Sequence, residues 1–140
     1  MDEELRRATR AGSFEEERIF ESLARRARPG ERPEELLFDL GLIEEHDFAL
    51  ELASRSRWQF SGLRGFVADP RLFVYLPLPI AIRERLCPLL LVGDSLKLAS
   101  AFLDPDVSYP TRRFPSLQIE LTIAARSEIL AALNGVAETL

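Results

Sequence analysis

The sequence predicts an α+β protein, in which a bundle of four short helices, made of a duplicated helix-turn-helix unit, precedes a small α+β layer. That layer is expected to hold a three-stranded sheet, formed by a β-hairpin plus one strand, and a C-terminal helix. Three observations predict this fold: a repeat in the first third of the chain, a Gly93-Asp94 turn between two apolar runs, and alternation of apolar and polar residues over 117–123. The expected parts are a helical subdomain over 1–56, a packed connector over 57–79 and an α+β subdomain over 80–140.

The repeat relates residues 12–26 to residues 41–55, which lie 29 positions further along the chain. Each copy has a glycine, an apolar residue, an acidic turn and then apolar residues four positions apart, which is the spacing of one helix face. We expect the two units to span about 3–26 and 32–55. A duplicated unit of this kind is typical of binding or assembly rather than catalysis. The aligned pairs are Gly12/Gly41, Phe14/Ile43, Ile19/Phe48, Leu23/Leu52 and Arg26/Arg55.

Local signals place the helices of the first part. Ser13 and Glu16 form a predicted capping box, Pro33 suits a helix start, and Gly41 suits the residue after a helix end. Helices this short are marginal alone in water, so they are expected to share one core. The expected helices cover 2–10, 14–27, 34–40 and 44–56, and the core includes Leu37, Leu40, Ile43, Phe48 and Leu52.

The connector over 61–79 combines prolines and glycines with apolar residues, which a polar linker would lack. We therefore expect it to pack against the rest of the protein. Its apolar residues are Leu63, Phe66, Val67, Leu72, Phe73, Val74 and Tyr75.

In the last part, Gly93-Asp94 predicts a hairpin with strands over 87–92 and 95–102. A short helix over 80–85 precedes it, and the third strand covers 117–123. The intervening residues 107–115 are interrupted by Pro110, and their structure is ambiguous. The closing helix is expected over 126–134, ended by Gly135.

Composition and motifs argue against several function classes. The net charge of −5 argues against nucleic-acid binding, and the chain has no phosphate-binding loop. His46 stands between Glu45 and Asp47, which point to different helix faces and cannot converge on one metal. The acidic residues of the helix starts, such as Glu44 and Glu45, are explained by the helix dipole. We expect no catalytic residue, no metal site and no enzyme activity.

Other features indicate the compartment. Cys87 is the single cysteine, so it forms no internal disulfide, and its apolar surroundings predict a small buried side chain. The sequence shows neither a signal peptide nor an apolar run long enough to span a bilayer. We expect a cytoplasmic protein, or one that a partner holds at the inner membrane.

Two segments, 36–45 (LLFDLGLIEE) and 126–130 (RSEIL), together with the repeat, the hairpin and the Asp104-Pro105 pair, resemble a known family. The chain is similar to the N-terminal domain of type II secretion and type IV pilus assembly ATPases from about residue 3 to residue 137. In secretion ATPases this resemblance implies a domain that docks onto the cytoplasmic domain of an inner-membrane platform protein. In a branch of pilus ATPases it implies binding of cyclic di-GMP by both copies of the repeat.

The nucleotide-binding pattern of that branch is only partly kept. Pro33-Glu34 stands where the pattern has Leu-Gly, Arg55 replaces its final Gln, and the first copy has Glu3-Glu4-Leu5 and Arg26 at the corresponding places. The resemblance therefore implies a retained scaffold with a decayed nucleotide site, and Arg26, Arg32 and Arg55 are the alternative cyclic di-GMP contacts. The second copy keeps Arg32, Leu37, Gly41, Leu42, Ile43, Phe48 and Leu52.

The resulting hypothesis is a non-catalytic protein-interaction domain of a secretion or pilus motor, either part of the ATPase or a free-standing relative. It is expected to need no cofactor and to bind the platform protein. The alternatives are a cyclic di-GMP sensor and a stand-alone regulatory adaptor in motility or signalling.

Overall fold

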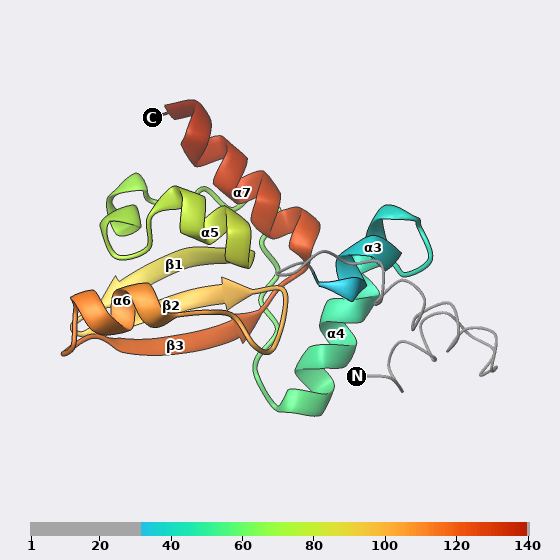
Figure 1. The fold of residues 1–140 in the computed structure, drawn as a ribbon, viewed down its shortest axis with the longest axis horizontal. Coiled ribbons are helices and arrows are strands. Elements are labelled where there is room, and N and C mark those ends of the chain that lie inside the picture. The colour runs from blue at the N-terminus through green and yellow to red at the C-terminus, as the bar shows by residue number, and fades with distance from the viewer. Residues whose placement is uncertain (1–31, 140) are drawn as a thin grey trace.

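The structure is a computed structural model that describes residues 32–139. The helices expected over 2–10 and 14–27, and with them the first copy of the repeat, lie outside the described residues. The α+β class is confirmed (Figure 1). The elements are α3 (Pro33–Asp39), α4 (Glu45–Ser56), the 3-10 helix η1 (Pro70–Val74), α5 (Leu78–Glu84), β1 (Leu86–Val92), β2 (Ser95–Ser100), α6 (Ser108–Arg113), β3 (Gln118–Ile123) and α7 (Arg126–Thr139).

The sheet has the strand order β1-β2-β3. β1 and β2 form the predicted antiparallel hairpin, and Gly93 takes the left-handed conformation that its tight turn requires, with φ of 59°. β3 then runs parallel to β2, so the chain must cross over between them. The short helix α6 lies in that crossover and settles the ambiguous segment 107–115.

The helices cover the sheet unequally. α5 and α7 pack against each other and against β1, whereas α4 packs at β3. Figure 1 shows α3 and α4 together at the end of the sheet where β2 and β3 finish. A continuous apolar core runs from Leu37 on α3 to Val136 on α7 and joins the helical part to the sheet. No described helix is long and apolar enough to cross a membrane.

The predicted helical core is mostly confirmed, because Leu37, Ile43, Phe48 and Leu52 are all buried. Leu40 is the exception, since 60% of it is exposed. The prediction failed there because α3 ends at Asp39 and Leu40 is the cap residue beyond it, outside the regular turn that buries Leu37.

The connector packs as predicted. The backbone N–H of Leu63 donates to the Glu128 carboxylate on α7 at 2.8 Å, and Leu63 is buried with Leu72 and Phe73. The expectation was wrong for Val74, which is 61% exposed, and for Val67, which is 87% exposed. A 3-10 helix has three residues per turn, so Val74 shares the solvent face of η1 with Arg71. Nothing in the structure explains the exposure of Val67.

The closing helix continues past the position where it was expected to stop. α7 includes Gly135 and extends to Thr139, five residues beyond Asn134. Ile129, Leu133 and Val136 lie on one helix face and are all buried. The burial of this face outweighs the roughly 1 kcal/mol that a helical glycine costs relative to alanine.

Gly135→Ala is therefore expected to stabilise the protein by up to about 1 kcal/mol, measured as the free energy of unfolding in urea. An added Cβ at Gly135 meets no atom within 4 Å, so only the helix propensity changes. Gly93→Ala is the matched control, because Gly93 has equal room but a positive φ, and the same change there is expected to destabilise. Two changes of the same sign would contradict this account.

Candidate functional site: an arginine-lined groove

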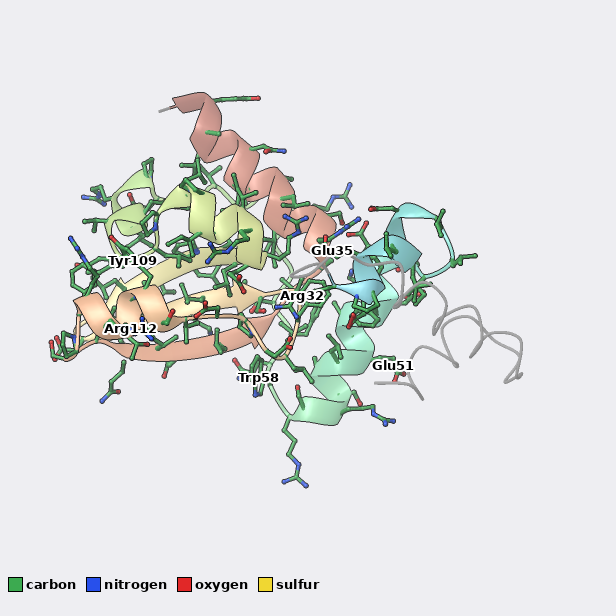
Figure 2. The ribbon with its side chains drawn as sticks, viewed as in Figure 1. Arg32, Glu35, Glu51, Trp58, Tyr109 and Arg112 are labelled. Atoms are coloured by element: carbon green, nitrogen blue, oxygen red, sulfur yellow. The ribbon has the colours of Figure 1, made fainter. Side chains whose placement is uncertain are left out.

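A groove of about 520 Å³ lies where α3 meets α5 and the first turn of α7. We call it the arginine groove. Figure 2 shows Arg32 and Glu35, which both line it, at the junction between α3 and the sheet. The lining residues are Arg32, Glu35, Leu36, Asp39, Arg83, Arg85, Arg126 and Leu130.

Arg126 binds three carboxylates with its three guanidinium nitrogens. Nε donates to Glu45 at 2.8 Å, Nη1 to Glu35 at 2.8 Å and Nη2 to Asp39 at 2.9 Å. Its side chain is only 11% exposed, and the guanidinium lies 4.9 Å from the ring centroid of Phe38. Burial by itself lowers the pKa of Arg126, but the three hydrogen bonds together raise it by more than burial lowers it. The net shift is upward, and the guanidinium stays charged. Arg126 therefore joins α3, α4 and α7.

Glu35 extends this network to α5. Its carboxylate accepts a hydrogen bond from Nε of Arg85 at 3.0 Å, has Nη2 of Arg85 2.8 Å away, and also accepts from Arg126. Arg85 follows α5 in the left-handed conformation, with φ of 55°, which is uncommon for a residue with a side chain. One carboxylate thus bridges two arginines from different helix ends.

Arg32 is also engaged with the protein. It lies at the start of α3, donates to the Asp104 carboxylate, and has Nη2 3.8 Å from Glu84. Its guanidinium is 4.4 Å from the ring centroid of Phe102. A phosphate that used Arg32 would have to compete with both carboxylates.

Glu34 occupies the place where the nucleotide-binding pattern has glycine. Burial raises the pKa of its carboxyl, and nearby Arg32 offsets only part of that rise. Glu34 follows Arg32 by two positions, at a place where a glycine would leave bare backbone for a ligand to approach. The residue adds both bulk and an acidic group to this end of α3.

The three arginines named from the sequence have different positions. Arg32 lines the arginine groove, whereas Arg55 is exposed in the last turn of α4 and is not among the lining residues. Arg26 lies outside the described residues. Their role as nucleotide contacts stays a prediction.

The remaining singled-out residues match their expected environments. Cys87 is fully buried, and burial raises the pKa of its thiol to about 12. His46 is exposed in the first turn of α4, where its backbone N–H donates to the Glu44 carboxylate at 3.1 Å. Glu44 is thus the helix cap, in line with the helix-start explanation of its charge. Glu45 does more than that explanation requires, since it also binds Arg126.

Sequence reasoning missed Arg126, Arg85 and Glu35. One signal was present in the sequence. Arg126 begins the closing helix, and a cation at a helix N-terminus is unfavourable for the helix dipole. A cation at this place is stabilised when acidic side chains lie close to it. Glu35 and Asp39 are four positions apart on α3, so their carboxylates lie on one helix face.

Comparison with known proteins agrees with this fold. The MshEN domain family matches residues 59–139, while no curated protein matches the chain. A crystal structure of the N-terminal domain of XpsE superposes with a TM-score of 0.59 and 26% identity, covering 89% of this chain and 97% of that one. A structure of MshE with cyclic di-GMP gives a TM-score of 0.53 and 22% identity, covering 82% and 85%, and this likeness shows the fold alone. The chain therefore belongs to the MshEN domain family and is homologous to the N-terminal domains of type II secretion and type IV pilus assembly ATPases.

Proposed function

We propose that the chain is a non-catalytic docking domain of a bacterial type II secretion or type IV pilus motor. It attaches the assembly ATPase, as part of it or as a free-standing relative, to the cytoplasmic domain of an inner-membrane platform protein. The observation that carries this proposal is the similarity to the XpsE N-terminal domain over 97% of that domain. The proposal places the protein in the cytoplasm, at the membrane surface through its partner.

The arrangement of the charged groups supports docking over nucleotide binding. In the arginine groove, Arg32, Arg85 and Arg126 all bind carboxylates of the same chain. These contacts join the helical part to the sheet and occupy the cations that a phosphate would need. The described surface of α3, α4 and their loop also carries exposed apolar side chains, a common property of protein-binding surfaces. They are Leu40, Leu42 and Leu50.

A calorimetric titration tests the proposal. We expect the purified cytoplasmic domain of the platform protein to bind this chain with a dissociation constant of roughly 10 µM or tighter. An unrelated acidic domain of similar charge serves as the control for non-specific attraction. If no heat is released with both proteins at tens of micromolar, the binding free energy is roughly −6 kcal/mol or weaker. That result would contradict docking.

Cyclic di-GMP binding is the second candidate, supported by the retained Arg32 and by the fold shared with MshE. We expect it to fail, because Arg32 is held by Asp104 and Glu34 replaces the glycine of the pattern. Calorimetry of the wild type against about 100 µM cyclic di-GMP should show no binding. A low micromolar dissociation constant that Arg32→Ala abolishes would establish the sensor function instead.

A further inference from the structure

β3 is an outer strand of the sheet, and its free side is only partly used. At its carboxyl end, Ile123 donates its N–H to the carbonyl of Gln59 at 2.8 Å and accepts from the N–H of Ser61 at 2.7 Å. This is a single parallel bridge between Phe60 and Ile123. The segment around Phe60 therefore covers only the carboxyl end of this edge, and it forms no further bridge to β3.

The hydrogen bonds show which residues of β3 face outward. Gln118 donates to Asp94 and Ala124 donates to Ser100, so the even-numbered positions face β2. Because backbone groups alternate sides along a strand, Ile119 and Leu121 face outward like Ile123. Within residues 32–139, the outward N–H and C=O groups of Ile119 and Leu121 have no hydrogen-bond partner. An unpaired edge of this kind is a template for another strand.

The side chains along this edge define what it would accept. Ile119 and Leu121 are half-buried and apolar and pack on the core, whereas Gln118 and Glu120 are exposed on the opposite face. Lys97 lies beside Glu120 on β2, yet no ion pair joins them. An added strand would therefore meet the apolar side chains of Ile119 and Leu121 on one face, and on the other face Gln118 and the Glu120 carboxylate, with Lys97 one strand further in.

The position of Glu120 argues against a second copy of this chain as the occupant. Two β3 edges paired about a two-fold axis through the unpaired segment would bring one Glu120 opposite or diagonal to the other, and like charges across a pair are destabilising. A cation on a different chain would instead be favoured at that place. Glu120, the ionisable residue of the unpaired edge, thus favours a basic residue opposite it on the added strand.

We propose that the β3 edge over Gln118–Leu121 binds an extended segment of a partner protein, with apolar residues at alternate positions and Lys or Arg opposite Glu120. The backbone bonds to Ile119 and Leu121 supply affinity, and Glu120 selects the charge. This inference rests on the proposed function and locates the partner of the docking domain.

Amide hydrogen exchange measured by NMR tests the proposal in two states. In the free chain, the N–H groups of Ile119 and Leu121 should exchange fast and those of Glu120 and Thr122 slowly, and slow exchange at all four would overturn the proposal because the edge is then already covered. On addition of the platform protein's cytoplasmic domain, Ile119 and Leu121 should become protected. If the platform domain binds without protecting these two N–H groups, the proposal for the β3 edge is wrong and the docking function stands. If the platform domain does not bind, both proposals are wrong.

Two variants test the β3 edge through the affinity for the platform protein's cytoplasmic domain. Ile119→Pro deletes an outward donor and is expected to abolish binding while circular dichroism and melting show a folded chain. Glu120→Lys is expected to weaken binding roughly tenfold, whereas Glu138→Lys, the same charge change at an exposed site on α7, should leave affinity within about twofold. Equal effects of the two lysine variants would overturn the proposal, even if Ile119→Pro fails to fold.

Discussion

Replacing Arg126 with alanine is expected to destabilise the protein by about 2–3 kcal/mol at neutral pH. The change removes three charge-assisted hydrogen bonds and leaves Glu35, Asp39 and Glu45 close together without their shared cation. The expected cost is at the lower end for a buried ion pair, because Asp39 is 62% exposed and water screens its share. Urea denaturation followed by circular dichroism measures it as a lower midpoint with an unchanged slope.

Arg71→Ala is the matched control for this prediction. Arg71 is also paired with an aspartate, Asp69, at 2.8 Å, but its side chain is 89% exposed and the pair is local. The expected change in the unfolding midpoint is therefore within the error of the measurement, because water screens an exposed pair almost completely. Equal small losses for the two variants would show that the arginine groove does not hold the helical part to the sheet.

Phe48→Ala is expected to cost about 3–5 kcal/mol, the largest loss predicted for a single substitution here. Phe48 is 2% exposed and its ring meets that of Phe38 edge-to-face, with centroids 5.1 Å apart. Phe38 in turn stacks on Phe102, 6.3 Å away, which follows β2. Truncation of Phe48 therefore opens a cavity at the place where α4 joins the sheet, and urea denaturation measures the cost.

Leu50→Ala provides the comparison on the same helix. Leu50 is 42% exposed, so its truncation removes little buried surface and should cost less than about 1 kcal/mol. Similar losses for Phe48 and Leu50 would mean that α4 does not pack on the sheet through the face described here.

Local patterns in the sequence predicted the elements well. Gly93-Asp94 predicted the hairpin, and the strict alternation over 117–123 predicted β3, because both signals depend on residues close together in the chain. The spacing of Phe48 and Leu52 predicted the buried face of α4 in the same way. Gly135 shows the limit of such signals, since tertiary burial of α7 outweighs its local preference.

The arrangement of the elements was less accessible. Strand periodicity does not reveal that β3 runs parallel to β2, because alternation is the same in either direction. The arginine groove was missed for a related reason: Arg126 is 91 residues from Glu35 and 81 from Glu45, and no local pattern reports such a contact. The resemblance to a known family indicated how the elements belong together, which periodicity alone does not. The same resemblance named Arg32 as an alternative nucleotide contact, and in the structure Arg32 binds Asp104.

The central claim is that this chain binds a protein and not a nucleotide. One pair of calorimetric titrations of the same wild-type sample tests it most directly, with the platform protein's cytoplasmic domain in one and cyclic di-GMP in the other. The account predicts saturable binding of the protein domain at roughly 10 µM or tighter and no heat from the nucleotide at about 100 µM. Low micromolar binding of cyclic di-GMP, together with no response to the platform domain, would contradict it.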